Sequence, residues 1–331
     1  MTGGLDSSAL PALAQVAEAD LVTELLAEAS GLAAEEAGAV SWVTTVLKDK
    51  PGRRCTIRYD APRSDGSTLA VIGKFYAQRR KAAEAYRLAE KLRRALGEDE
   101  RCLPEPLLAA PELGLFLQEA VDGLQLEAVP EQDRTRSFAL AARWLARLHG
   151  AAPIPRLGLK PLQHELQKAE GWAEEVASFL PAPALRVLRS TQERIHALTA
   201  EMSPPQPAMI HRDFYYANVL WDGRRIWVLD LDQLSIGDPA MDVGHFLAHI
   251  EKLSYFTTGR FDSLALWAER FLEPYLRESA LELHPRSSFF KAYTHLKLAA
   301  TETQRRETGW RRRSRAFAVR AGHVVDEARG E

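Results

Sequence analysis

The order of hydrophobic and polar residues changes character twice along this chain. Between residues 13 and 37, leucine and alanine recur at helical spacing with a break at Ser30-Gly31, which predicts one or two short helices. The segments that follow are short and rich in β-branched or aromatic residues; they are 40–47, 54–59, 69–76 and 114–119. Turn residues separate them, as at Lys50-Pro51-Gly52, so we expect an antiparallel sheet.

One helix is expected among these strands, and most of the remaining chain is predicted to be helical. Residues 79–97 present one apolar face and end at Gly97, a typical helix stop. Pro130 can occupy the first turn of a helix that closes at Gly150. Further helical patterns cover 162–179, 182–200 and the region from about residue 241 to the end.

A short hairpin interrupts the helical part. Residues 219–221 and 226–229 are apolar and flank the turn dipeptide Asp222-Gly223. The pattern therefore predicts an α+β protein with a helical segment at 1–38, a β-rich lobe at 39–121 and a helical lobe at 122–331.

Composition and charge fit a soluble globular protein. Hydrophobic residues make up 46% and charged residues 27% of the chain, and the net charge is −2, so no global attraction to nucleic acid or anionic membrane is expected. Two cysteines, Cys55 and Cys102, provide no disulfide framework. The N-terminus lacks the basic and apolar regions of a signal peptide, and no apolar run is long enough to span a membrane. We expect a cytoplasmic protein.

Four polar residues stand out in the otherwise apolar stretch around the hairpin. His211, Asp213 and Asn218 precede its first strand, and Asp230 follows its second. The two arms of the hairpin would bring Asn218 and Asp230 back to the same end. Mg²⁺ prefers oxygen ligands of this kind and often needs only one or two carboxylates plus substrate phosphates. Each residue alone could be a helix cap or turn former, but the spacing favours a metal site beside a catalytic carboxylate.

This spacing resembles that of kinases. His211-Arg212-Asp213 with Asn218 matches the H-R-D-x-x-x-x-N catalytic loop of protein kinases. The Gly237-Asp238-Pro239-x-x-Asp242 motif that follows resembles the aminoglycoside phosphotransferase and choline kinase superfamily of small-molecule kinases. The resemblance implies a protein-kinase-like two-lobe fold, with an antiparallel sheet and one key helix in the first lobe and a mainly helical second lobe. It also implies ATP as co-substrate, with GTP possible, and Mg²⁺.

The resemblance assigns roles to the residues of the loop. Asp213 would be the catalytic base, Asn218 a metal ligand, and Asp230 the principal Mg²⁺ ligand. Asp242 would hydrogen-bond the backbone of the catalytic loop. His211 is interpreted as a packed residue that holds the loop rather than as a chemical participant.

It also assigns a nucleotide site in the first lobe. Lys74 would contact the α- and β-phosphates, with Glu84 as its ion-pair partner on the helix. Glu90 lies on the same predicted helix but about 120° away, so only one of the two can face Lys74. Backbone groups near Glu119 and Val121 could pair with adenine.

Two departures from protein kinases leave alternatives open. Asp232 stands where those enzymes have glycine, and it could bind a second Mg²⁺ or accept backbone hydrogen bonds. The phosphate-covering loop has one glycine, Gly52, and no G-x-G-x-x-G motif. Only residues 231–236 separate Asp230 from Gly237, too few for the usual peptide-docking segment, which favours a small-molecule acceptor over a protein.

The acceptor itself stays open at the level of sequence. Residues 285–320 contain ten lysines and arginines but two glutamates, a local charge of +8 centred on 305–315. This region is either a solvated helix surface or a cradle for an anionic substrate or partner, and it argues against a polycationic antibiotic as native substrate. The function expected is phosphate transfer from ATP to a hydroxyl of a sugar, amino alcohol or aminoglycoside-like compound. The alternatives are a pseudokinase that binds an acidic partner and a protein Ser/Thr kinase. The oligomeric state is not predicted.

Overall fold

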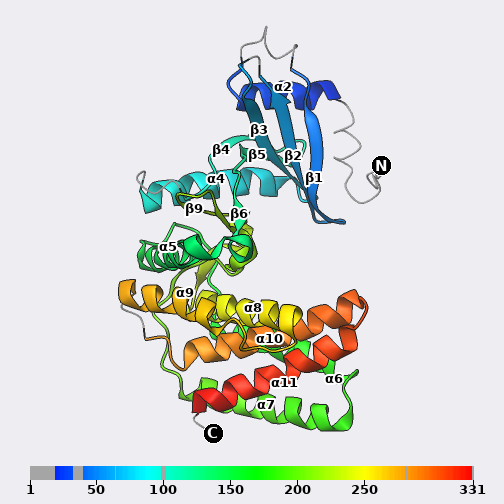
Figure 1. Cartoon of the computed structure of the whole chain (residues 1–331), viewed down its shortest axis with the longest axis vertical. Coiled ribbons are helices and arrows are strands. Elements are labelled where there is room, and N and C mark those ends of the chain that lie inside the picture. Colours follow the sequence, from blue (N-terminus) through cyan, green and yellow to red (C-terminus); the bar gives the residue numbers. More distant parts are fainter. Residues whose placement is uncertain (1–18, 33–39, 64, 98–101, 280–281, 330–331) are drawn as a thin grey trace. The chain divides into compact units, whose positions relative to one another are not determined.

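The computed structural model describes residues 19–32, 40–63, 65–97, 102–279 and 282–329. The chain divides into two compact units (Figure 1). The first contains Met1–Asp122 together with Trp227–Asp232, and the second contains Gly123–Ile226 and Gln233–Glu331. A short segment that is remote in sequence therefore completes the first unit.

The first unit is built on a five-stranded antiparallel sheet with the strand order β1-β2-β3-β5-β4. Its strands are β1 (Val43–Lys50), β2 (Arg54–Pro62), β3 (Thr68–Tyr76), β4 (Pro106–Ala110) and β5 (Leu115–Glu119). Four of them lie at or near the four segments predicted from the sequence. The edge strand β4 was not predicted, and β1 begins and ends three residues later than expected.

Side chains of the sheet alternate between two faces, and a helix covers each. One face packs Val71, Phe75 and Leu117 against Val22 and Leu26 of α2 (Ala19–Ala29). The opposite face packs apolar residues against α4 (Arg80–Leu96), which confirms the predicted helix between the strands. The α2 helix ends at the expected Ser30-Gly31 break; the other predicted helical residues before 40 lie outside the described residues.

The adjacent residues Gly73 and Lys74 of strand β3 point to opposite faces of the sheet. Because β3 alternates, Gly73 faces the α2 side, where a Cβ atom would come within 2.9 Å of the Tyr59 ring. Lys74 consequently points to the α4 side, in register with Thr56 on β2 and Phe116 on β5. Tyr76, two residues on, faces the same side and lies opposite Arg54.

The second unit is mainly helical, as predicted. Its helices are α5 (Glu131–Gly150), α6 (Leu162–Ala177), α7 (Ala182–Glu201), α8 (Ala240–Thr258), α9 (Ala265–Glu278), α10 (Arg286–Arg305) and α11 (Trp310–Arg329). The α10 helix packs against α6, α8 and α11, and α5 packs against α9. Helices α8 and α10 approach closely at Gly244, where a Cβ atom would lie 2.6 Å from the backbone oxygen of Ser287.

Short strands and single-turn helices connect these helices and carry the polar motif. The strands are β6 (Leu124–Gln125), β7 (Ala208–Ile210), β8 (Val219–Trp221), β9 (Ile226–Val228) and β10 (Ser235–Gly237). Strand β7 pairs with β10, and β6 pairs with β8. The turn between β8 and β9 is closed by a hydrogen bond from the Asp222 N–H to the Arg225 carbonyl, so the predicted turn at Asp222-Gly223 is confirmed.

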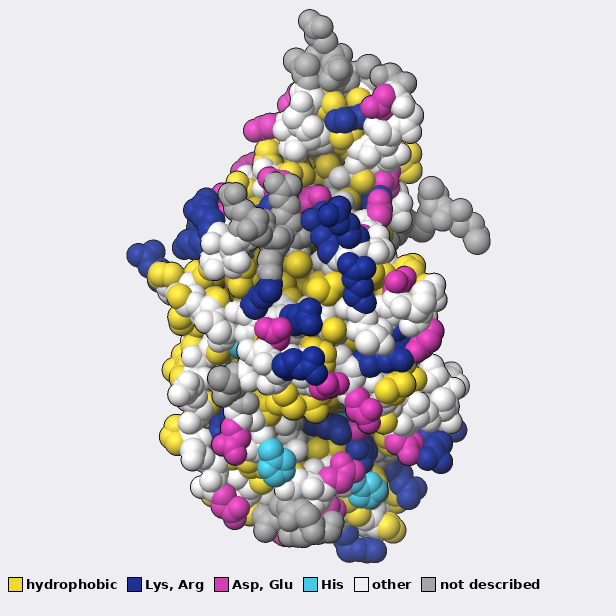
Figure 2. All heavy atoms as spheres, turned by 60° about the vertical axis from the view of Figure 1, so that its left-hand side comes forward, with side chains coloured by type: hydrophobic (Ala, Val, Ile, Leu, Met, Phe, Trp, Pro, Cys, Tyr) yellow, Lys and Arg dark blue, Asp and Glu magenta, His cyan; other side chains and the backbone are white. Residues whose placement is uncertain are grey.

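The surface of the described residues carries charges of both signs, and the two cysteines are free. Figure 2 shows basic and acidic side chains intermingled on one face, with hydrophobic patches between them. Cys55 is buried and Cys102 is partly buried, and neither forms a disulfide. Within the described ranges, none of the helices combines the length and the apolar character that a membrane span requires.

Candidate active site

The loop after β7 is held by one buried carboxylate. Asp242, in the first turn of α8, is fully buried and accepts hydrogen bonds from the backbone N–H groups of His211 at 2.7 Å and Arg212 at 2.6 Å. His149 lies 3.1 Å from the same carboxylate. Arg212 has a φ of 67°, a conformation that few residues other than glycine adopt and that the surroundings must stabilise. The role expected for Asp242 is therefore confirmed.

Asp213 is the carboxylate that this loop presents. Its Oδ1 atom lies 3.5 Å from Nε2 of His245, and the Asn218 side-chain amide donates to its carbonyl at 2.8 Å and to its Oδ2 atom at 3.2 Å. Burial alone would raise the pKa of the Asp213 carboxyl, but the hydrogen bond from His245 and the positive charge of Lys297 outweigh burial and lower it. The group is ionised at neutral pH and can accept a hydrogen bond from a substrate hydroxyl.

The orientation of Asn218 suits a second role. Because its amide nitrogen faces Asp213, its amide oxygen is directed elsewhere and can serve as a ligand for a hard cation. His211 is fully buried, contacts the Trp144 and Phe214 rings, and accepts a hydrogen bond from the Asp213 N–H at 3.3 Å. It packs the loop, as interpreted from the sequence.

Two histidines and a tyrosine form a buried cluster beside Asp213. The His245 ring lies 4.4 Å from the His249 ring, which in turn lies 4.3 Å from the Tyr215 ring. Burial lowers the pKa of both histidines, so they are neutral at pH 7. His245 was not predicted as a site residue, although its position three residues after Asp242 on a helix offered a signal, since residues three apart share a helix face.

Basic residues surround the Asp213 loop. Lys252 on α8 and Lys297 on α10 lie close enough to Asp213 to interact electrostatically, and burial lowers the pKa of both amines. The guanidinium of Arg212 binds Glu165 at 3.0 Å, and Lys168 binds the same carboxylate at 3.2 Å. Lys252 and Lys297 are thus the basic residues near the loop that act on Asp213, whereas Arg212 and Lys168 are paired with Glu165.

The basic stretch at 305–315 has two kinds of member. Arg313 binds Glu302 at 2.6 Å, and Arg306 stacks on Phe179 and Trp310, so both have roles in packing. Arg312 and Arg315 are exposed and line a pocket of about 370 Å³ with the rings of Tyr255 and Phe261. This pocket does not contain the catalytic loop.

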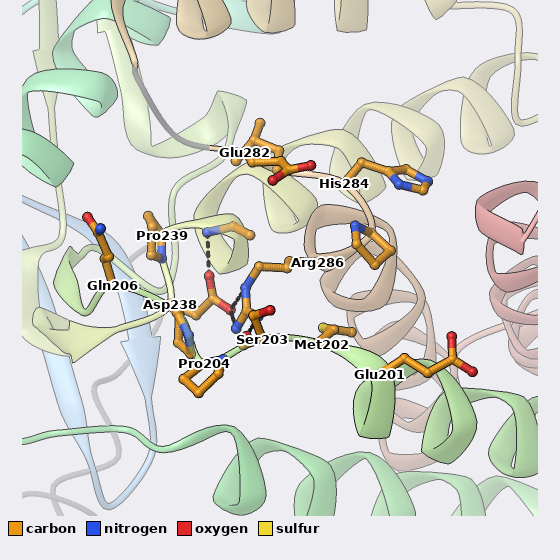
Figure 3. A pocket seen from close by; sticks show the side chains of 14 residues that line it. Glu201, Met202, Ser203, Pro204, Gln206, Asp238, Pro239, Glu282, His284 and Arg286 are labelled. Carbon is orange, nitrogen blue, oxygen red and sulfur yellow. Dashed lines mark hydrogen bonds and ion pairs between the residues drawn. The ribbon is translucent and has the colours of Figure 1, made fainter.

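The Gly237-Asp238-Pro239 segment is structural. Asp238 accepts a hydrogen bond from the Ala240 N–H at 3.0 Å and so caps α8, and it binds the buried Arg286 through Nε at 2.7 Å. Figure 3 shows this pair in a pocket of about 430 Å³, where Arg286 also reaches the Ser203 carbonyl at 2.5 Å. The pocket contains none of the residues expected to take part in catalysis.

The nucleotide-site residues lie in the first unit. Lys74 is 8% exposed, and its Nζ atom lies 5.9 Å from the centroid of the Phe116 ring. Lys74 and Asp230 both line a small pocket of about 20 Å³, together with Gln118 and Asp232. The structure therefore brings the expected phosphate-binding lysine and the expected magnesium ligand to one place.

Arg54, which was not predicted as a site residue, binds the carboxylates of both Asp230 and Asp232. The Arg54 guanidinium binds both oxygens of Asp230, each at 2.8 Å, and also binds Asp232. Tyr76 donates a hydrogen bond to the other oxygen of Asp232 at 2.9 Å. Asp230 has a φ of 62°, so it also holds a conformation that favours glycine.

The structure does not bring Glu84 to Lys74. The Glu84 side chain is 59% exposed and lies 4.0 Å from Arg80, one turn earlier on α4. The apolar face of α4, with Ala82 and Ala89, packs on the sheet, and Glu84 lies about 140–160° from it around the helix. Glu90 pairs with Arg94 instead, so neither glutamate acts as the expected partner.

The hinge segment follows β5. The Glu119 N–H donates to the Glu105 carbonyl at 2.8 Å, and the Glu119 carboxylate accepts from the Glu105 N–H at 3.0 Å. This amide is therefore occupied and is not open to adenine while the bond persists. Val121 lies in the irregular segment beyond the strand and is partly buried.

Across the described part of the chain, no group of three or more His, Cys, Asp or Glu side chains could hold a metal ion. Mg²⁺ needs fewer protein ligands than that when substrate phosphates complete its coordination. Asp230 and Asp232 of the first unit offer carboxylate oxygens, and Asn218 of the second unit offers an amide oxygen; both are donor types that this ion takes.

Known proteins share both the sequence pattern and the fold. A family model described as the phosphotransferase enzyme family (APH) matches residues 56–288. A choline/ethanolamine kinase family protein from Mesorhizobium loti is similar with a TM-score of 0.58 at 17% identity, over 93% of this chain and 95% of that chain. No curated protein sequence matches.

Aminoglycoside phosphotransferase structures are also similar. A thermostable mutant of APH(4)-Ia has a TM-score of 0.60 at 14% identity, over 90% of this chain and 98% of that chain. The ADP-bound APH(2'')-Ib has a TM-score of 0.53 at 13% identity, over 86% and 94%. These similarities confirm the predicted kinase-like α+β fold.

Proposed function

Since the chain belongs to the phosphotransferase enzyme family and is a phosphotransferase of the kinase type, we propose that it transfers the γ-phosphate of ATP to a hydroxyl group of a small molecule. The observation that carries this proposal is the environment of Asp213. An ionised carboxylate, with Asn218 hydrogen-bonded to it and His245 3.5 Å away, is held on a loop that Asp242 fixes.

Each residue of the proposed site has a role that follows from its chemistry. Asp213 accepts the hydrogen bond of the acceptor hydroxyl and aims its oxygen at the γ-phosphorus. It takes up the hydroxyl proton as the new oxygen–phosphorus bond forms, while the bond from the γ-phosphorus to the β–γ bridging oxygen breaks and ADP leaves. Lys74 compensates the negative charge of the phosphates. Backbone groups near Val121 contact the adenine, since the Glu119 amide is already bonded.

Magnesium is the cofactor that these residues fit. Asp230 would hold it through its carboxylate and Asn218 through its amide oxygen, and the ion would neutralise charge on the transferred phosphate. Asp232 provides a further carboxylate next to Asp230, since Arg54 binds both.

We further propose that the acceptor carries a negative charge, or at least no positive charge. Lys252 and Lys297 both interact electrostatically with Asp213, whereas Arg212 and Lys168 are already paired with Glu165. A polycation would be repelled by these groups, whereas a hydroxy acid or a phosphorylated sugar would be attracted.

Thermal unfolding with ATP or GTP, each with and without Mg²⁺, tests the nucleotide part. A ligand at 100 times its dissociation constant adds about 2.7 kcal/mol of stability, which raises the unfolding temperature by a few degrees. We expect a Mg²⁺-dependent shift that is lost in Asp230→Asn. No shift at millimolar concentration of either nucleotide would contradict the kinase reading and favour a binding protein without catalysis.

A panel of acceptors tests the transfer part. We expect phosphate transfer to hydroxy acids or sugar phosphates to exceed transfer to kanamycin-like compounds. Asp213→Ala should abolish transfer while the nucleotide-dependent shift in unfolding temperature persists. Efficient turnover of a polycationic antibiotic would overturn the proposed acceptor class, and wild-type rates in Asp213→Ala would remove this residue from the mechanism.

A further inference from the structure

Arg54 lies where a kinase-like nucleotide site needs positive charge. It begins β2, directly after the turn that replaces a glycine-rich phosphate loop, and its side chain is 8% exposed. Lys48, Lys50 and Arg53 of the same hairpin are exposed, so Arg54 is the member whose charge is directed inward. This hairpin therefore has cationic side chains at the position where a glycine-rich loop would offer backbone N–H groups to phosphate.

Arg54 and Lys74 face the same side of the sheet. Thr56 is in register with Lys74 and Arg54 with Tyr76, so Arg54 and Lys74 are diagonal neighbours on adjacent strands. Diagonal neighbours lie roughly 7–8 Å apart, with their Cβ atoms somewhat closer, a separation that two long side chains bridge easily. A phosphate chain beside Lys74 is therefore also within reach of Arg54.

The partners of Arg54 are the carboxylates that the proposed function assigns to magnesium. Two N–H groups of the guanidinium bind the two oxygens of Asp230 at 2.8 Å, the parallel geometry that fixes arginine on carboxylate most firmly. Asp232 is held by the same guanidinium and by Tyr76. Because each Asp230 oxygen accepts a hydrogen bond from Arg54 and lies next to its positive charge, a metal ion must compete with the guanidinium for this carboxylate.

From this arrangement we propose that Arg54 is a phosphate-binding residue that neutralises the metal-binding carboxylates until magnesium and nucleotide displace it. The inference rests on the proposed function. Asp230 would hold the Mg²⁺ ion, and the Arg54 guanidinium would turn from this carboxylate to the phosphates, so its buried charge would exchange one anionic partner for another. The binding of metal and the binding of nucleotide are therefore coupled. A metal ion on Asp230 would free Arg54 to bind phosphate, and a phosphate would compensate the buried charge of the freed guanidinium.

Metal binding without nucleotide provides the first test. The unfolding temperature of the wild type, Arg54→Ala and Arg54→Lys is measured across a Mg²⁺ titration. We expect Arg54→Ala to be stabilised at Mg²⁺ concentrations at least tenfold lower than the wild type, since its carboxylates are no longer occupied. Adding Asp230→Asn to Arg54→Ala should remove that response. An identical Mg²⁺ response in the wild type and both Arg54 variants would overturn the competition.

Nucleotide binding provides the second test. The affinity for ATP in saturating Mg²⁺ should fall about tenfold or more in Arg54→Ala, the effect of one lost charge-assisted contact, and less in Arg54→Lys. Arg58→Ala is the matched control, because Arg58 lies on the same strand and binds Asp60 and Asp122 instead. An affinity within twofold of the wild type in both Arg54 variants would overturn phosphate binding.

The two tests distinguish a failure of the role inferred for Arg54 from a failure of the proposed function. If the wild type binds no nucleotide, the proposed function fails, whereas the Mg²⁺ titration still decides whether Arg54 competes with metal. If the wild type binds MgATP and the Arg54 variants match it in both measurements, the function stands and Arg54 is a structural ion-pair residue. Arg54→Lys retains a positive charge, so it keeps the test decisive if Arg54→Ala does not fold.

Discussion

The Oδ1 atom of Asp242 lies 2.6 Å from the backbone nitrogen of Arg212, a residue with a φ of 67°. Such a conformation costs of order 1–3 kcal/mol, and it persists only where neighbouring groups stabilise it. The buried carboxylate provides that stabilisation and so fixes the direction in which the next residue, Asp213, leaves the loop.

Asp242→Asn tests this relationship. Asparagine has one acceptor oxygen instead of two, so one of the two backbone N–H groups loses its partner. We expect unfolding free energy to fall by about 1–3 kcal/mol and phosphate transfer to fall tenfold or more, with ATP binding retained. Urea unfolding and steady-state kinetics measure both. Unchanged kinetics in a destabilised variant would restrict Asp242 to folding.

His245→Phe tests how Asp213 is kept ionised. The hydrogen bond from His245 lowers the pKa of the Asp213 carboxyl, so its removal should raise that pKa. Because the ionised form is active, the acid limb of the rate profile should move to higher pH. His249→Phe is the control, since His249 has no hydrogen bond to Asp213 among the described contacts. An acid limb at the same pH in all three proteins would contradict this role of His245.

Glu251→Gln tests an ion-pair network that joins three helices. Glu251 on α8 binds Arg320 of α11 at 2.8 and 2.7 Å and His295 of α10 at 2.7 Å, and it also pairs with Lys291. Despite burial, these hydrogen bonds lower the pKa of Glu251. We expect a loss of about 3 kcal/mol at pH 7, since removing one partner leaves charges buried.

The pH dependence of this loss has a definite sign. A carboxyl whose pKa is lower in the folded state stabilises the fold above its unfolded pKa, about 4.3, and the contribution is lost as pH falls. The difference between wild type and Glu251→Gln should therefore shrink in acid. Glu327→Gln is the control, because Glu327 binds the same Arg320 but is 56% exposed. Equal losses in the two variants would contradict the importance of burial here.

Gly244→Ala tests the close approach of α8 and α10. The added Cβ would lie 2.6 Å from the Ser287 oxygen and 2.7 Å from the Lys291 nitrogen, both backbone atoms. We expect a loss of about 1–3 kcal/mol in unfolding free energy. Gly171→Ala in α6 has open space around the new atom and should stabilise by up to about 1 kcal/mol. Similar effects of the two substitutions would show that the helices can separate without cost.

Local patterns predicted those parts of the fold that local chemistry determines. The short segments rich in β-branched or aromatic residues became β1, β2, β3 and β5, and the apolar face of 79–97 became the α4 helix. The edge strand β4 was missed because its sequence, Pro-Leu-Leu-Ala-Ala, neither alternates nor contains β-branched residues. It is a strand because β5 offers it backbone partners, which sequence periodicity does not reveal.

The candidate site shows the same division. Asp242 and the loop it holds follow from a motif of fixed spacing, and the family match over residues 56–288 agrees with that motif. Glu84 was predicted to pair with Lys74 because of its position on the helix. In the structure, the face of α4 that packs on the sheet is the one that carries Ala82 and Ala89, so Glu84 points away. No sequence motif includes Arg54. Its role follows from its ion pair with Asp230, which lies 176 residues later in the chain.

That separation has a consequence for how the protein is made. Trp227–Asp232 belongs to the first unit, and the Val228 N–H is bonded to the Cys102 carbonyl at 2.7 Å. During synthesis, Arg54 emerges from the ribosome long before its carboxylate partners are translated. The ion pairs of Arg54 with Asp230 and Asp232 can therefore form only after residue 232 has been added, and nascent chains that end at Asp122 lack the acidic residues that complete this unit.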